Sequence, residues 1–195
     1  MNKTKSNQKK SNIMSYVYAA IIALLIVACA VVIAIVNVKN TNQTLSVSEN
    51  TVLVSGKTYI APLNNATVAK DYSGSELQYN DTLKQWEIHK AIDFIAGDDK
   101  NVYAMTNGTV SNVYTNYLEG TVIEISHAEG LVSVYKSLDE NVTVKIGDKV
   151  QAGDVIATVS ASMAQELNSG NHLHFELLKD GKKVNPNDYL DLGAK

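Results

Sequence analysis

The chain has 195 residues, enough for one domain of ordinary size and a membrane anchor. Its formal net charge is −3 and all 17 of its basic residues are lysines, so neither charge nor guanidinium chemistry favours nucleic-acid binding. Cys29 is the single cysteine, which excludes an intramolecular disulfide, and the folded part must depend on its core or on a metal ion.

The N-terminal quarter of the chain has the pattern of a membrane anchor. No charged residue lies between Lys10 and Lys39, and the apolar run 16–36 is long enough for the roughly 20 residues that cross a bilayer. Lysines are concentrated before this run, so the positive-inside rule puts the N-terminus in the cytoplasm and the rest of the chain outside the cell membrane. In chain order we predict a cytoplasmic tail, a single transmembrane helix and a polar tether (1–14, 15–38 and 39–50).

Cys29 leaves a second interpretation of this region open. Residues 26–29 resemble a lipoprotein lipobox, in which the cysteine carries a lipid. Six further apolar residues, 31–36, continue the run beyond it without a break. This length favours an uncleaved membrane helix, with lipidation of Cys29 as the alternative.

From Thr51 onwards the sequence changes to short runs rich in β-branched residues, separated by turns that contain glycine. This pattern predicts a mainly β domain over residues 51–195, with at most a turn or two of helix at 161–167. The predicted strands are 51–54, 58–60, 102–104, 109–114, 121–126, 131–135, 142–146, 155–159 and 172–178.

Three of the four histidines form two motifs in this domain. His89 and Asp93 make an H-x-x-x-D pattern, and residues four apart in an extended segment point to the same face. His172 and His174 alternate in an apolar run, so their rings also share one face. Two imidazoles and a carboxylate are a common zinc set that leaves a fourth position for water or substrate. Taken alone, either motif also fits the polar face of an ordinary strand.

The order and spacing of these pieces resemble the lysostaphin/LytM-type zinc metallopeptidase domain over about residues 86–190. The resemblance is carried above all by His89-Lys-Ala-Ile-Asp93 and His172-Leu-His-Phe-Glu176. It implies a compact LytM-type antiparallel β-sheet domain that binds Zn²⁺ through His89, Asp93 and His174. His172 would then be a catalytic histidine beside the metal. His127 follows a predicted strand at a turn, where a histidine is common in this family without a catalytic role, so we expect it to be a structural or surface residue.

The chain departs from this family where a second catalytic histidine is expected. Ser137 stands there, in the string Tyr135-Lys-Ser-Leu138, and a serine hydroxyl is far too weak a base to replace imidazole at neutral pH. Losing a general base typically costs about 10²–10⁴ in rate. In addition, Ala91 replaces a glycine of the first motif, and segment 160–170 replaces a Gly-rich loop. The metal-binding set is therefore intact, whereas the proton-handling set is incomplete.

The predicted arrangement also resembles that of membrane-anchored sporulation proteins of endospore-forming bacteria. It consists of a cytoplasmic tail, one transmembrane helix, a tether and one degenerate domain of this type. That resemblance implies a zinc-binding scaffold or receptor in the forespore membrane, with its domain in the intermembrane space. Its partner there would be a stage III sporulation protein AH-like membrane protein, and the pair would support engulfment and a mother cell–forespore channel. Two alternatives stay open: a membrane-anchored zinc-dependent peptidoglycan endopeptidase that relies on His172, and an inactive regulator of a separate wall amidase.

Overall fold

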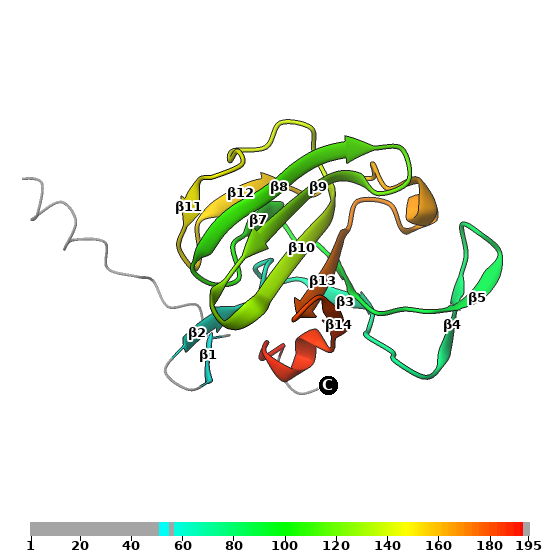
Figure 1. Cartoon of the computed structure of the whole chain (residues 1–195). Coiled ribbons are helices and arrows are strands. Elements are labelled where there is room, and N and C mark those ends of the chain that lie inside the picture. The colour runs from blue at the N-terminus through cyan, green and yellow to red at the C-terminus, as the bar shows by residue number, and fades with distance from the viewer. Residues whose placement is uncertain (1–50, 55–56, 193–195) are drawn as a thin grey trace, which may run out of the picture. The chain divides into compact units, whose positions relative to one another are not determined.

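The computed structural model describes residues 51–54 and 57–192 (Figure 1). These residues belong to one compact unit, Val47–Lys195. The predicted tail, transmembrane helix and tether, together with Cys29, lie outside the described residues. Among the residues that are described, none forms a helix with the length and apolar character needed to cross a bilayer.

An eight-stranded sheet is the main element, with the order β11-β8-β9-β10-β13-β6-β3 and with β14 paired to β13. Its neighbouring strands are all antiparallel. The predicted mainly β, antiparallel architecture is therefore confirmed. The strands are β3 (Thr67–Lys70), β6 (Ile92–Ile95), β8 (Gly108–Asn116), β9 (Gly120–Ser126), β10 (Leu131–Leu138), β11 (Lys149–Val150), β13 (Leu173–Lys179) and β14 (Lys182–Val184).

Three smaller two-stranded sheets and three 3-10 helices complete the described part. The small sheets are β1 (Thr51–Val54) with β2 (Lys57–Ile60), β4 (Leu77–Asn80) with β5 (Gln85–Ile88), and β7 (Asn101–Tyr103) with β12 (Val155–Thr158). The 3-10 helices are η1 (Ala128–Gly130), η2 (Ala164–Ser169) and η3 (Pro186–Asp188). The β4–β5 hairpin extends away from the large sheet (Figure 1), and hydrogen bonds of Asn80 and Thr82 connect it to segment 160–170.

The core lies against the central strands β9, β10 and β13, most of whose residues are buried. Period-two alternation in β13 divides its side chains, so Leu173 and Phe175 belong to the hydrophobic core while His174 and Glu176 face the other way. Tyr135 of β10 is fully buried and packs on Phe175 with ring centroids 5.2 Å apart. The strand β13, which carries His174, is thus held in place by fully buried residues of the core.

Segment 142–146 is a correction to the predicted strands. It forms no strand in the structure: the Thr143 N–H donates to the Ile156 carbonyl at 3.0 Å, and the Lys145 N–H donates to the Asp148 carboxylate at 3.0 Å. Its apolar residues Val142 and Val144 are packed against the core, which explains their alternation without a ladder. The 3-10 helix η2 agrees with the predicted helical turn at 161–167.

Candidate metal centre

The site is built where β13 pairs with β6. His174 lies directly opposite Asp93 in this antiparallel ladder, so their side chains stand next to each other on one face. His174 Nδ1 lies 2.8 Å from Asp93 Oδ1. Both residues are almost fully buried, with 7% and 1% of their surface exposed. The sheet itself therefore brings together two of the three predicted metal ligands.

His89 reaches the same point from the segment between β5 and β6. Its Nε2 lies 3.2 Å from Asp93 Oδ2, so the predicted convergence of the H-x-x-x-D pair is present. The reason differs from the prediction, because β5 ends at Ile88 and β6 begins at Ile92 in a different sheet. The chain turns at the buried Ala91, and this bend, not one continuous strand, aims the ring at Asp93.

Glu166 joins these three residues from η2. Its Oε2 lies 3.0 Å from His174 Nδ1, and its Oε1 lies 3.8 Å from His89 Nε2. One donor atom from each of His89, Asp93, Glu166 and His174 lies within 4.8 Å of the others, and all four side chains are buried. Sequence reasoning assigned no role to Glu166. The available signal was a single acidic residue in the segment that precedes the His172–His174 motif.

Two buried atoms test whether a metal ion fits this cluster. His89 Nε2 and Asp93 Oδ2 both lack a hydrogen-bond partner in the described part of the chain, although only 3.2 Å separates them. His89 Nδ1 lies 3.2 Å from the Asp71 carbonyl, an acceptor, so we assign the ring proton to Nδ1. The lone pair of Nε2 then faces the lone pairs of a carboxylate, and a cation between them would satisfy both. The imidazole and carboxylate donors suit Zn²⁺.

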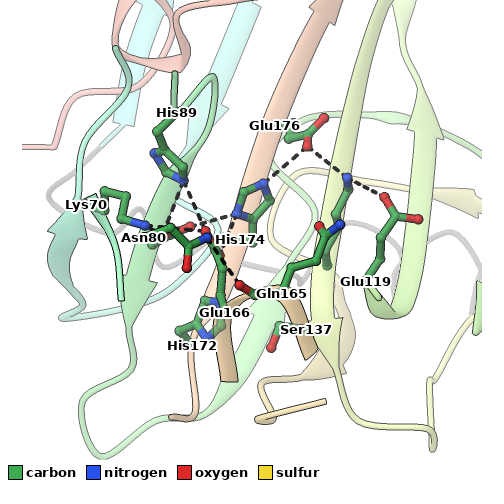
Figure 2. Close-up of polar contacts among 12 residues, drawn as sticks. Lys70, Asn80, His89, Glu119, Ser137, Gln165, Glu166, His172, His174 and Glu176 are labelled. Atoms are coloured by element: carbon green, nitrogen blue, oxygen red, sulfur yellow. Dashed lines mark hydrogen bonds and ion pairs between the residues drawn. The ribbon is translucent and has the colours of Figure 1, made fainter. Parts of the chain in front are cut away.

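His174 is oriented by a second carboxylate on its far side. Its Nε2 donates to Glu176 Oε1 at 3.2 Å (Figure 2), which leaves Nδ1 to face Asp93 and Glu166. Glu176 in turn binds Lys136 Nζ at 2.8 Å and Lys183 Nζ at 2.9 Å. Metal-bound histidines commonly donate their other N–H to such a carboxylate, and this partner fixes the tautomer. Glu176 is the last residue of the His172-Leu-His-Phe-Glu176 motif, but the sequence alone did not predict that it orients His174.

Negative charge dominates the cluster in the absence of an ion. Burial works against the charged form, but hydrogen bonds from His172 and His174 hold the pKa of Glu166 below its usual range. Burial also opposes protonation of His174, yet its bonds to Asp93, Glu166 and Glu176 raise its pKa well above the ordinary value. Lys70 approaches from the exposed side, with Nζ 3.5 Å from Glu166 Oε1. Without a metal, protonated histidine and lysine must balance the carboxylates.

His172, the predicted catalytic histidine, lies beside this cluster and is completely buried. Its backbone forms an isolated bridge with Ser160. Its Nδ1 lies 2.9 Å from the Gly170 carbonyl and its Nε2 lies 3.2 Å from Glu166 Oε2. Both ring nitrogens therefore already face acceptors of the chain itself. Burial opposes protonation, but the bond to Glu166 raises the pKa of His172.

Ser137 makes its side-chain hydrogen bond to segment 160–170, and not to the metal-ligand candidates. Its hydroxyl donates to the Ser160 carbonyl at 2.9 Å, and its side chain is fully buried. The residue has a φ of 62°, in the left-handed region, where the β9–β10 ladder shifts register between Tyr135 and Leu138. Among the described contacts of its side chain, none is made to a metal-ligand candidate. The hydroxyl at this position is thus used to hold the strand edge to segment 160–170.

His127 is also separate from the cluster. Its Nδ1 lies 2.9 Å from the Asn107 carbonyl, and its Nε2 lies 2.7 Å from Ser133 Oγ. These bonds connect the turn before β8 to the neighbouring part of β10. This placement agrees with the structural role expected for His127.

A groove of about 300 Å³ lies next to the candidate ligands. The β4–β5 hairpin contributes Asn80 and Glu87 to its wall, and the segment before β13 contributes Met163 and Gln165. His89, Glu166 and His174 also line it. This groove therefore gives access to the position between the candidate ligands.

Comparisons with known proteins give one family and two groups of relatives. The sequence model of peptidase family M23 matches residues 87–186. Stage II sporulation protein Q of Bacillus subtilis (strain 168) is 41% identical over 115 residues, covering 58% of this chain and 39% of that protein. Peptidoglycan DD-endopeptidase ShyC of Vibrio cholerae serotype O1 (strain ATCC 39315 / El Tor Inaba N16961) is 26% identical over 126 residues, covering 65% and 28%. The chain therefore spans well under half the length of these curated relatives.

Among solved structures, a chain in the SpoIIQ–SpoIIIAH pore forming complex superposes on this one with a TM-score of 0.59 at 32% identity. The match covers 69% of this chain and 92% of that chain. These likenesses confirm the two resemblances predicted from the motifs and the architecture, to the lysostaphin/LytM type and to a sporulation protein.

Proposed function

Because this chain belongs to peptidase family M23 and keeps a metal-ligand set without a complete proton-handling set, we propose that it is a zinc-stabilised, non-catalytic scaffold in sporulation. Its domain would hold Zn²⁺ through His89, Asp93 and His174. The observation that carries this proposal is the position of Ser137, whose hydroxyl donates to the Ser160 carbonyl and reaches none of these three ligands. A site that can bind an ion but lacks one of the two expected catalytic histidines is better suited to stabilising the fold than to hydrolysis.

The likeness to stage II sporulation protein Q supports the cellular role. On that basis we place the chain in the forespore membrane, with residues 51–195 in the intermembrane space after a tail (1–14), a membrane helix (15–38) and a tether (39–50). The proposed partner is a stage III sporulation protein AH-like membrane protein, because the matched structure is the SpoIIQ–SpoIIIAH pore forming complex. The pair would support engulfment and a mother cell–forespore channel.

Zinc would contribute stability in this role. The proposed ligands come from three separate parts of the chain, the segment before β6, β6 itself and β13. An ion that binds only the folded arrangement stabilises it by mass action. The partner surface would thereby be kept in one conformation without any hydrolysis.

A zinc-dependent peptidoglycan endopeptidase is the second candidate, because two observations favour it. A groove of about 300 Å³ lies beside the candidate ligands, and His172 is retained next to the cluster. When bound with an open position, zinc polarises a carbonyl group and lowers the pKa of its water toward neutrality. His172 would then be the one histidine available to move a proton.

Binding to the partner tests the scaffold proposal. The external unit, Val47–Lys195, would be titrated by calorimetry with the external domain of stage III sporulation protein AH from the same organism, while separate samples are incubated with purified peptidoglycan. Saturable binding without released muropeptides supports the scaffold. Zinc-dependent muropeptide release supports the endopeptidase instead, and capture of a wall amidase in place of the sporulation partner supports the regulator.

A further inference from the structure

Glu166 lies in the cluster of candidate metal ligands and has a non-helical backbone conformation. It lies within η2 but has a φ of −132° and a ψ of 30°, outside the helical range. This kink turns its side chain inward, so that only 3% of the residue is exposed, while its neighbours on both sides are more accessible. An ionisable side chain is rarely buried to this extent unless partners hold it.

The segment that carries Glu166 is held from two sides. On one side, the Ala164 and Gln165 N–H groups donate to the carbonyls of Tyr117 and Leu118, in the turn between β8 and β9, at 3.4 and 3.3 Å. On the other side, the Asn80 amide donates to the Gln165 carbonyl at 3.2 Å. The position of the carboxylate is therefore supported by two distant elements, and does not depend on its own contacts alone.

The β4–β5 hairpin adds further bonds to the same segment. The Asn168 N–H donates to Thr82 Oγ1 at 2.9 Å, and the Asn168 amide donates to the Asp81 carbonyl at 3.0 Å. Both partners lie in the turn of the hairpin. Any ligand formed by Glu166 would connect the hairpin to the large sheet through the metal.

We propose that Glu166 is a fourth protein ligand, which closes the coordination position otherwise left to water or substrate. The set His89, Asp93, Glu166 and His174 then gives two imidazoles and two carboxylates, whose charge balances that of one Zn²⁺ ion. Four protein ligands are typical of structural zinc sites, whereas catalytic sites keep one position open. The unpartnered, buried atoms His89 Nε2 and Asp93 Oδ2 mark the place that the ion would occupy.

The same carboxylate also engages His172. Glu166 Oε2 lies 3.2 Å from His172 Nε2, the ring nitrogen that does not face the Gly170 carbonyl. One side chain of segment 160–170 thus blocks both the open metal position and the retained histidine. This inference rests on the proposed metal site, and it supplies a second reason for the lack of turnover, independent of Ser137.

Cobalt substitution tests the closed position directly, because Co²⁺ reports its coordination through visible absorption. The purified full chain would be loaded with Co²⁺ and titrated with azide, a small ligand that binds a metal only at an available position. We expect no azide-dependent spectral change in the wild-type chain and a saturable change in Glu166→Ala. Zinc affinity, measured by competition with a chromophoric chelator, should also fall by at least about tenfold in Glu166→Ala, since even an outer partner of a ligand is worth about 10–100-fold.

Glu87→Gln is the matched control, because Glu87 lines the same groove but bonds to Asn80 and Gln85 instead of the histidines. It should behave like the wild type in both measurements. An azide-dependent change in the wild-type spectrum overturns the inference. This measurement needs only the wild-type chain, so it tests the inference even if Glu166→Ala fails to fold.

The two proposals fail in different ways. A chain that binds Co²⁺ but admits azide keeps its proposed metal site and loses only the closed position. A chain that binds no Co²⁺ overturns both the metal site and the fourth ligand, and leaves an ion-pair cluster with Lys70. A third outcome is a Co²⁺ form that shows no response to azide in a chain that still cleaves peptidoglycan. That result contradicts the non-catalytic role and leaves the fourth ligand in place.

Discussion

His174 and Asp93 are direct cross-strand neighbours in the β13–β6 ladder, with Nδ1 and Oδ1 2.8 Å apart. Two motifs separated by 81 residues in the chain are thereby joined by the register of one sheet. A one-residue slip of either strand would turn these side chains to opposite faces. The register of the central sheet therefore positions these two candidate ligands, and the proposed metal binding can be tested without reference to hydrolysis.

Chelation should destabilise the wild-type chain but not a ligand variant. With zinc at about 1,000 times its dissociation constant, binding stabilises the fold by about 4 kcal/mol, or roughly 10 °C in melting temperature for a domain of this size. EDTA should lower the melting temperature of the wild type by this amount. The melting temperature of His89→Ala should be lower than that of the zinc-bound wild type and should not change when EDTA is added. Differential scanning calorimetry measures both.

His127→Ala is the control for that experiment. Because His127 bonds to the Asn107 carbonyl and Ser133, its loss should lower stability while leaving the response to EDTA intact. A His89→Ala chain that still responds to EDTA like the wild type would contradict the assignment of His89.

Glu176→Gln should weaken zinc binding although Glu176 is not a proposed ligand. The carboxylate accepts from His174 Nε2 and fixes the ring so that Nδ1 faces the proposed metal position. We expect a loss of about 10–100-fold in zinc affinity. Lys183→Ala should have a smaller effect, because Lys136 still binds Glu176. Equal affinities for Glu176→Gln and the wild type would show that this hydrogen bond does not orient the ligand.

The metal-free chain should be most stable in mildly acidic solution. The pKa values of Glu166 and Glu176 lie below the ordinary 4.5 in the fold, so their contribution is present above about pH 4.5 and is lost as the pH falls through the folded values. The pKa of His174 lies well above the ordinary 6.5, so its contribution is present below pH 6.5 and is lost as the pH rises through the folded value. Urea denaturation in EDTA should show a plateau between these limits.

Zinc binding should release protons at pH 7. His174 is held protonated in the metal-free chain by its carboxylate neighbours, and Nδ1 must lose its proton before it can bind an ion. Calorimetric titrations in buffers with different ionisation enthalpies measure the number released. A count near zero would mean that His174 is neutral before zinc arrives, contrary to the geometry of its three carboxylate contacts.

The metal should also order the segment around η2. Hydrogen exchange at residues 160–170 and in the β4–β5 hairpin should accelerate on chelation, because the proposed Glu166 ligand links both to the sheet. Exchange in β9, most of whose residues are buried, should accelerate only through the loss of global stability. Acceleration at 160–170 that does not exceed the acceleration in β9 would indicate global destabilisation without local release.

The sequence predicted four strands of the large sheet, β8, β9, β10 and β13, and three candidate ligands that the structure brings together. It did not predict β3, β6, β11 or β14, and the difference lies in the strength of the local pattern. β9, β10 and β13 carry dense apolar and β-branched runs between glycine turns, which predict strands. β4 (LQYN) and β5 (QWEI) do alternate apolar and polar residues, but each is only four residues long, and neither is among the predicted strands. Segment 142–146 misleads in the opposite direction, because its valines pack on the core from a loop.

Glu166 could not be assigned in the same way. It lies eight residues before His174, in a segment without periodicity, and its position depends on bonds to the β8–β9 turn and to Asn80. Such contacts follow from the tertiary structure and leave no local pattern. Ser137, in contrast, was identifiable as a substitution, but only the structure revealed that its hydroxyl is used by the Ser160 carbonyl.

The most direct test of the central claim combines metal content and cleavage in one sample. The purified chain would be analysed by native mass spectrometry and then incubated with purified peptidoglycan, with chromatography of any soluble muropeptides. A closed, silent site predicts about one zinc ion per chain and no release above that of an EDTA-treated control. Zinc-dependent release of muropeptides would contradict the account, because it would mean that the metal and His172 suffice for hydrolysis.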